Sequence, residues 1–262
     1  MTVALIDGDT VAYRCAVIGQ EDVDWGDGEP SRVVRTDYAA SRAIEMCRKW
    51  IKATKSRNAI LAFSDDNNFR KILCDTYKAN RKGPKPDCYR DVVDRLKAEF
   101  TSYVFPYCEG DDVLGILQTC GRWDTIIISN DKDMMTVPGR HWNPFTNVKK
   151  TVKPPQAEFS WMMQTLTGDS VDGYKGCPGV GAKRAERLLK SARSQNLMDL
   201  WALVVKEFEK AGLDEEHAIQ QARLAKILTH VDYDRTNDQI LLWCPEGTVK
   251  FSHESSGESN GN

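Results

Sequence analysis

Long hydrophobic runs are missing from this sequence of 262 residues. No apolar stretch reaches the roughly 18 residues that a membrane-spanning helix needs. The N-terminal segment Met-Thr-Val-Ala-Leu-Ile-Asp also lacks the basic start and the long apolar stretch of a secretory signal peptide. We therefore expect a cytoplasmic protein that makes no membrane contact.

Paired cysteines are missing as well. The eight cysteines are spread singly, with no C-x-x-C pair and no Cys/His spacing typical of zinc sites. We interpret them as reduced thiols that mostly fill the core. The four histidines lie away from the acidic motifs described below, which speaks against a zinc hydrolase.

Net charge is nearly absent, since the total is −2, but the charges are segregated. Nine Lys/Arg face four Asp/Glu between Arg70 and Lys97, and six face one between Lys175 and Arg193. A solvated helix face is the commonest meaning of one such run. Two basic runs beside acidic clusters indicate that the protein binds a polyanion, whose backbone contacts metal ions held by the acids. With 41% hydrophobic residues, the chain can bury one large core, or a core with a smaller appendage.

Short apolar runs that end in acids are the main structural signal. Four strands are predicted, at 3–6, 59–63, around 103–105 and at 125–129, and they run into Asp7, Asp65 and Asp66, Glu109-Gly110-Asp111-Asp112, and Asp131 and Asp133 respectively. Helical patterns at 36–54 and 89–100 alternate with these strands. Such alternation predicts a parallel sheet, whose ligand site lies outside the carboxyl ends of the strands. Four strands would therefore deliver acids to one edge.

Crowded carboxylates repel one another and raise each other's pKa unless a positive charge lies among them. Mg²⁺ or Mn²⁺ suits a site made of carboxylates without histidine. For any single aspartate here, a turn or helix-cap role is as plausible as metal binding. For the whole set, metal binding is the better interpretation.

A basic segment links the second and third predicted strands. It contains Arg70 and then the grouping of Tyr77, Lys78 and Arg81, which joins an aromatic ring to two cations, as nucleic-acid-binding proteins do. For Lys82 and Lys85, an exposed basic loop is an equally good explanation.

The sequence changes character after Thr151. Pro154-Pro155 mark a junction, and Gly168-Asp169-Ser170-Val171-Asp172 precedes a Gly-rich turn that opens a basic helix at Lys183. The Gly spacing is not that of a nucleotide-binding P-loop. Such a turn is expected to bind the phosphodiester backbone of a nucleic acid without contacting its bases. Two helical patterns between 197 and 228 and an apolar run at 240–243 would complete this part.

Taken together and in order, these motifs resemble the 5′-nuclease superfamily, especially the short bacteriophage 5′→3′ exonucleases. The resemblance rests on L-I-D-G-D, F-S-D-D-N-N-F-R-K, Y-K-A-N-R-K, E-G-D-D, S-N-D-K-D, G-D-S-V-D-G-Y-K-G and P-G-V-G-A-K-R-A. It extends from residue 5 to about residue 187, and the helix at 222–228 is also similar.

The resemblance implies an α/β fold, with a mostly parallel sheet flanked by helices in a PIN-like nuclease core. The core would cover residues 1–155 and carry a basic arch near 70–100. A helix-three-turn-helix DNA-binding region would cover residues 156–245, and residues 246–262 would be a disordered tail.

The resemblance also implies residue roles. The metal-site acids would be Asp7, Asp65, Glu109, Asp111, Asp112, Asp131, Asp133, Asp169 and Asp172. Lys78 and Arg81 would act at the scissile phosphate, beside Asp131, and Tyr77 would stack on the terminal base. The DNA-binding residues would be Arg70, Tyr77, Lys78, Arg81, Lys82, Lys175, Gly176, Gly179, Gly181, Lys183 and Arg184. The segment after the second strand is shorter than the family pattern, which leaves the choice between Asp65 and Asp66 open. Asp9 replaces a residue that is often Thr or Ser and is not expected to be a ligand.

The implied function is a divalent-metal-dependent 5′→3′ exonuclease or 5′ flap endonuclease in phage DNA replication or recombination, acting in the host cytoplasm. Two Mg²⁺ ions, replaceable by Mn²⁺, would serve the reaction. K⁺ at the Gly176–Gly181 turn is a further expectation. The substrate would be double-stranded DNA with a 5′ end, nick or flap, and RNA in RNA/DNA hybrids is a second expected substrate.

Two alternatives remain at this stage. Asp7-Gly8-Asp9-Thr10-Val11 fits the D-x-D-x-[TV] loop of haloacid-dehalogenase-like phosphatases, with Asp7 as nucleophile and Asp9 as acid/base. That reading gives no role to the Glu109–Asp112 cluster. A non-catalytic nucleic-acid-binding module would explain the basic runs but not the acids, which repel phosphate when no metal is bound.

Overall fold

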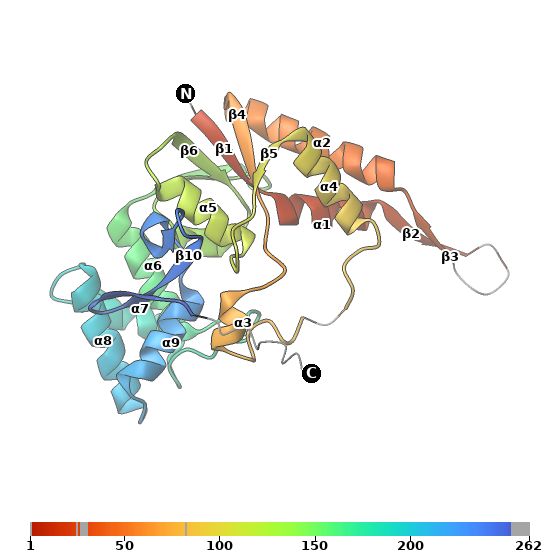
Figure 1. Cartoon of the computed structure of the whole chain (residues 1–262). Coiled ribbons are helices and arrows are strands. Elements are labelled where there is room, and N and C mark those ends of the chain that lie inside the picture. Colours follow the sequence, from red (N-terminus) through yellow and green to blue (C-terminus); the bar gives the residue numbers. More distant parts are fainter. Residues whose placement is uncertain (1, 25, 27–30, 82, 253–262) are drawn as a thin grey trace, which may run out of the picture.

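The structure is a computed structural model that describes residues 2–24, 26, 31–81 and 83–252 (Figure 1). Lys82, a predicted DNA-binding residue, lies outside the described residues, as does the segment 253–262 of the predicted tail. Within the described ranges, no helix is both long and apolar enough to cross a bilayer.

A six-stranded sheet forms the centre of the molecule, in the order β5-β4-β1-β6-β7-β8. These strands are β1 (Thr2–Asp7), β4 (Asn58–Ala62), β5 (Thr101–Tyr103), β6 (Asp124–Ile128), β7 (Gly139–Asn143) and β8 (Val148–Val152). Every neighbouring pair is parallel except β7 and β8. The predicted α/β class with a mostly parallel sheet is therefore confirmed.

Helices cover both faces of the sheet, and strand β1 shows why. Its alternate residues belong to different cores: Val3 and Leu5 pack on one side and Ala4 and Ile6 on the other. The second side is covered by α1 (Gly8–Ile18), α2 (Thr36–Ala53) and α4 (Tyr89–Glu99), and the first by α5 (Gly110–Thr119) (Figure 1). Because both faces of the sheet are buried at its centre, the strands β1, β4 and β6 each carry a continuous apolar run.

The third strand ends earlier than predicted. Strand β5 stops at Tyr103, and Phe105 leaves the sheet to stack on Tyr233, with ring centroids 5.0 Å apart. Two short antiparallel strands, β2 (Gln20–Val23) and β3 (Ser31–Val34), project outward from the end of α1 and the start of α2 (Figure 1). A short helix α3 (Phe69–Leu73) begins the basic segment.

Four helices form a second core after the sheet: α6 (Pro154–Thr167), α7 (Ala182–Lys190), α8 (Leu197–Lys210) and α9 (Glu215–Ala225). Trp161, Leu200 and Phe208 are buried at its centre. Between the sheet and α6 lies the 3-10 helix η1 (Lys132–Thr136), which follows β6.

The chain then returns to the first core. It forms the 3-10 helix η2 (His230–Asp232) and the strands β9 (Tyr233–Asp234), β10 (Gln239–Cys244) and β11 (Gly247–Lys250). Ile240, Leu242 and Phe251 pack in the same core as Leu5 and α5. The tail predicted to begin at residue 246 is wrong for residues 247–250, because β11 pairs antiparallel with β10.

Candidate active site

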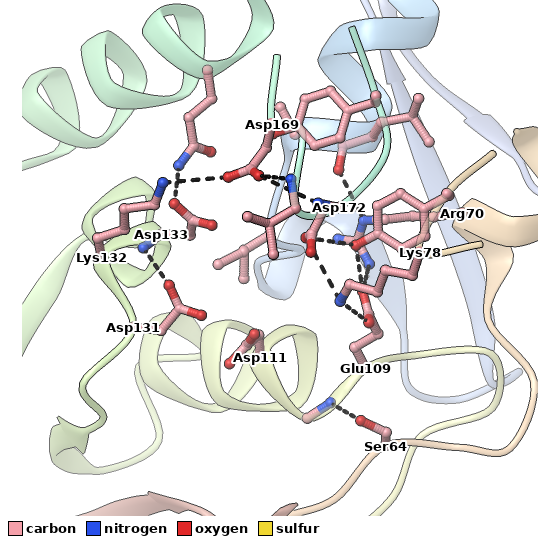
Figure 2. Close-up of a pocket in the computed structure, with 18 of the residues that line it drawn as sticks. Ser64, Arg70, Lys78, Glu109, Asp111, Asp131, Lys132, Asp133, Asp169 and Asp172 are labelled. Carbon is pink, nitrogen blue, oxygen red and sulfur yellow. Dashed lines mark hydrogen bonds and ion pairs between the residues drawn. The ribbon is translucent and has the colours of Figure 1, made fainter. Parts of the chain in front are cut away.

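A pocket of about 340 Å³ lies at the carboxyl end of the parallel strands (Figure 2). Side chains reach it from the ends of β1 and β6, from the first turn of α5, from the segment after α3 and from the loop 169–174. Its polar lining comprises Asp7, Asp9, Thr10, Ser64, Arg70, Tyr77, Lys78, Arg81, Glu109, Asp111, Asp131, Lys132, Asp133, Gln164, Asp169, Asp172 and Tyr174. The structure thus brings together seven of the nine predicted metal-site acids in one pocket, and the two exceptions are Asp65 and Asp112.

Among the residues that the structure describes, no lysine or arginine forms an ion pair with the carboxylates on the Asp111 side of the pocket. Burial, followed by the charges of Asp7 and Asp131, raises the pKa of Asp111 well above its ordinary value. Burial and Asp9 raise the pKa of Asp7 to about 6, although Thr10 donates two hydrogen bonds to this carboxylate. Burial and Asp131 likewise raise the pKa of Asp133 to about 6. This side of the pocket therefore has an excess of negative charge.

The opposite side of the pocket holds paired charges. Burial would raise the pKa of Glu109, but the cations of Lys78 and Arg70 outweigh it and lower the pKa to about 2. Lys78 forms an ion pair with Glu109, and its ammonium also lies 3.7 Å from Asp172. Arg81 donates to Asp172 at 2.6 Å. Lys78 and Arg81 thus lie across the pocket from the unpaired acids.

Asp169 belongs to neither side entirely. Its carboxylate accepts hydrogen bonds from the amide of Val171 at 2.8 Å and from Lys132 at 3.3 Å. Burial opposes these contacts, but together the backbone amides and Lys132 lower the pKa of Asp169. Gln164 on α6 donates to Asp133 at 2.5 Å, so the second helical core also contributes to the pocket.

Asp112 and Arg70 differ from their predicted roles. Asp112 is fully buried, and its carboxylate accepts one hydrogen bond from each Nη atom of Arg70, both at 2.7 Å. Asp112 is therefore not free to bind metal. Arg70 is only 3% exposed, which removes it from direct contact with DNA. Asp112 also accepts the Glu109 amide at 3.0 Å, which makes it the capping acid of α5.

Asp65 is also misplaced by the prediction. Its carboxylate accepts a hydrogen bond from the amide of Tyr107 at 2.8 Å, in the loop before Glu109. Asp65 does not line the pocket. Asp9, which was not expected to be a ligand, lines the pocket instead. Asp9 accepts the Ser64 amide at 2.7 Å and the Tyr89 hydroxyl at 2.6 Å. The D-x-D spacing at the end of β1 was the only sequence signal for it.

Tyr77 cannot stack on an unpaired base in this arrangement, because its side chain is buried. It is 4% exposed, and its ring stacks on Tyr174 with centroids 6.5 Å apart. Its hydroxyl donates to Glu109 at 2.8 Å. Tyr77 therefore orients a carboxylate of the pocket, a role that its spacing from Lys78 did not reveal.

The Gly-rich turn lies outside the pocket and before α7. Lys175, Gly179, Gly181, Lys183 and Arg184 are all exposed. Gly176 is not: it is buried, its amide donates to Gln221 at 2.8 Å, and an added Cβ would lie 2.3 Å from the Gly168 amide. The glycine at 176 is therefore required by close backbone packing and is not exposed for DNA contact.

The donor set suits a hard divalent cation, because the pocket offers carboxylate oxygens and no histidine or cysteine. The raised pKa values at Asp7, Asp111 and Asp133 indicate the same need for positive charge. Within the part of the chain that the structure describes, no three acidic, His or Cys side chains already surround one point. Lysine and arginine groups meet several of the acids instead.

Comparison with known proteins agrees with this site. The model of the family "5′-3′ exonuclease, N-terminal resolvase-like domain" matches residues 2–160. The exodeoxyribonuclease of Enterobacteria phage T3 is 30% identical over 289 residues, covering 93% of this chain and 93% of that protein. The flap endonuclease Xni of Shewanella halifaxensis is 28% identical over 205 residues, covering 72% of this chain and 80% of that protein.

A solved structure shares the fold. The bacteriophage T5 flap endonuclease in complex with DNA and metal ions superposes with a TM-score of 0.66 at 17% identity, covering 87% of this chain and 89% of that one. The chain therefore belongs to the 5′–3′ exonuclease family, which confirms both the predicted superfamily and the predicted class of enzyme, a 5′→3′ deoxyribonuclease.

Proposed function

We propose that the pocket is a two-metal phosphodiesterase centre that cleaves DNA at a 5′ end, nick or flap. One observation carries this proposal: unpaired acids and a pair of cations face each other across one pocket. Asp7, Asp111, Asp131 and Asp133 line one side, and Lys78 and Arg81 the other. Carboxylates attract metal, and cations attract phosphate, so the pocket fits a metal-bound phosphodiester.

The acids that would hold two Mg²⁺ ions, or Mn²⁺ in their place, are Asp7, Glu109, Asp111, Asp131, Asp133, Asp169 and Asp172. When bound, such ions would activate water and stabilise the attacking and leaving oxygens of an in-line displacement. Of the acids in this set, the protein orients Asp7 through Thr10, Glu109 through Tyr77, and Asp133 through Gln164. Glu109 and Asp172 would need to exchange part of their contact with Lys78 and Arg81 for metal.

Lys78 and Arg81 have a direct role in this proposal. Arg81 is 54% exposed and Lys78 is 14% exposed, so Arg81 is accessible to a strand that approaches from solvent. Their charges would neutralise the negative charge that grows on the scissile phosphate in the transition state. The family assignment leaves the phosphatase alternative without support, and Asp9, its acid/base, already has both oxygens in hydrogen bonds.

The Gly-rich turn and α7 would hold the duplex away from the pocket. Lys175, Lys183 and Arg184 are exposed there together with the backbone of Gly179 and Gly181. We place K⁺ at this turn as part of the proposal, and the helical region 156–245 as the DNA-binding unit. The T5 relative binds DNA and metal ions, which supports the class of substrate. The proposal also includes activity on RNA in RNA/DNA hybrids. It further includes a role in phage DNA replication or recombination and a location in the host cytoplasm.

The test uses 5′- and 3′-labelled duplex, nicked and flapped DNA, with Mg²⁺ and with chelator. We expect products released from the 5′ end that carry a 5′-phosphate, and no cleavage in chelator. Asp131→Ala should reduce cleavage by about two orders of magnitude or more. Unchanged Mg²⁺-dependent cleavage by this variant would sink the proposal, and release of phosphate from p-nitrophenyl phosphate without DNA cleavage would favour the phosphatase.

A further inference from the structure

Arg70 is a buried arginine whose side-chain N–H groups are all engaged. Nε donates to the carbonyl of Leu224 at 3.1 Å, and Nη2 donates to the carbonyl of Lys226 at 2.5 Å. Nη1 and Nη2 each donate to Asp112 at 2.7 Å, and Nη1 also reaches Glu109 at 3.1 Å. These five contacts account for the five N–H donors of a guanidinium.

Arg70 and its partners join three separate parts of the chain. Arg70 itself lies on α3, Asp112 and Glu109 lie at the start of α5, and Leu224 and Lys226 lie at the end of α9. Asp112 strengthens the same junction, because it accepts the amide of Leu228 at 3.0 Å. Gly115 on α5 shows how close the junction is, since an added Cβ there would lie 2.3 Å from the Leu228 carbonyl.

Glu109 depends on this junction for its orientation. Its backbone amide donates a hydrogen bond to Asp112, and its Oε2 atom accepts hydrogen bonds from Tyr77 and from Arg70. Lys78 forms an ion pair with the other oxygen of Glu109, Oε1, and lines the pocket. Arg70 thus contacts Glu109 through a side chain that is only 3% exposed and that the protein holds on every side.

We propose that Arg70 is a positioning residue for the reaction: through Asp112 it aims Glu109 into the pocket and fixes α5 to the end of α9. This inference rests on the proposed function of the pocket. It assigns Arg70 an effect on metal binding and turnover, without contact to DNA. A lysine could keep the charge but not the planar fork that reaches two carboxylates and two carbonyls at once.

The test compares the wild type with Arg70→Lys and Arg70→Gln. Mn²⁺ affinity is measured without DNA, from the electron paramagnetic resonance signal of free Mn²⁺, and kcat and KM are measured on nicked DNA. We expect both variants to bind Mn²⁺ about 10- to 100-fold more weakly. Their kcat should fall at low Mn²⁺ and recover in part at high Mn²⁺, while KM for DNA stays within about twofold of the wild-type value.

Asp232→Asn is the matched control. Asp232 is also buried, pairs with Lys226 at 3.1 Å, and belongs to the same junction, but it does not touch Glu109. This control should lower the melting temperature and leave Mn²⁺ affinity and kcat unchanged. If Arg70→Lys binds Mn²⁺ like the wild type, or if Asp232→Asn loses as much Mn²⁺ affinity as Arg70→Lys, then Arg70 is only a stabilising residue.

Two further outcomes are decisive. If neither Arg70 variant folds, Asp112→Asn replaces them, because it keeps the side-chain size and should weaken Mn²⁺ binding in the same direction; normal Mn²⁺ affinity in this variant would overturn the inference. A wild-type protein that binds Mn²⁺ but cleaves no DNA would contradict the proposed function, whereas the loss of affinity in the Arg70 variants is read independently of cleavage.

Discussion

Several carboxylates in the pocket destabilise the metal-free protein when they are ionised. Asp7 and Asp133 have pKa values of about 6, and that of Asp111 is raised well above its ordinary value, because burial and neighbouring acids disfavour their charged forms. An acid with a raised pKa binds more protons in the folded than in the unfolded state. The free energy of unfolding therefore falls as the pH rises from about 4 through the raised pKa values. At neutral pH, these residues oppose folding of the metal-free protein.

Replacing one of these acids should stabilise the metal-free protein and abolish its activity. For Asp111→Asn, we expect the free energy of unfolding at pH 7.5 in chelator to rise by about 1 to 3 kcal/mol. Most of this gain should disappear near pH 4, where the folded protein already holds the proton. Thermal unfolding at both pH values measures the effect, with the exposed Asp75→Asn as control. A lower melting temperature for Asp111→Asn at pH 7.5 would contradict the assignment of uncompensated charge.

Among the elements, helix α7 and the turn before it are separate from the pocket. Lys183 and Arg184 begin α7 and are exposed, whereas Ala185 and Leu189 on its other side are buried against the second core. Arg184 pairs with the buried Glu207 on α8, which fixes its side chain to the neighbouring helix. The element therefore presents cations on one face and packs with the other, as backbone binding requires.

Loss of one of these cations should weaken DNA binding without slowing the chemical step. Lys183→Ala should lower affinity for duplex DNA and reduce the slope of log K against log salt by about one. Its kcat at saturating DNA should equal that of the wild type. Lys206→Ala, an exposed lysine on α8, is the control and should leave both quantities unchanged. Equal salt slopes for Lys183→Ala and the wild type would exclude Lys183 as a phosphate contact.

On the scale of the whole molecule, the nuclease core is not confined to the first part of the chain. Six buried side chains from the last part of the described chain complete the core around α5: Ile227, Leu228, Tyr233, Ile240, Leu242 and Phe251. Each such side chain contributes about 1.5 to 3 kcal/mol on burial. Their sum is comparable with the whole stability of an ordinary domain, about 5 to 15 kcal/mol.

A chain truncated after residue 155 should therefore not fold as an independent nuclease core. We expect near-ultraviolet circular dichroism to be lost, a hydrophobic dye to bind, and unfolding to be non-cooperative, in contrast to the full chain. Cooperative thermal unfolding of the truncated chain would show that residues 1–155 form a domain without the C-terminal strands.

The sequence alone determined four of the six strands of the sheet, the edge of the sheet where the acids gather, and the family; strands β7 and β8 were not predicted. Apolar runs, turn residues and acid spacing are local, so they could be read without the fold. Only the tertiary structure decided which acids are free and which are paired. Arg70 meets the Leu224 carbonyl across 154 positions, and that remote contact turns it from a predicted DNA contact into a buried anchor for Asp112. The same holds for Asp9, Asp65 and Tyr77: spacing places a side chain near the end of a strand, whereas its direction and its partner depend on segments that pack against it from elsewhere in the chain.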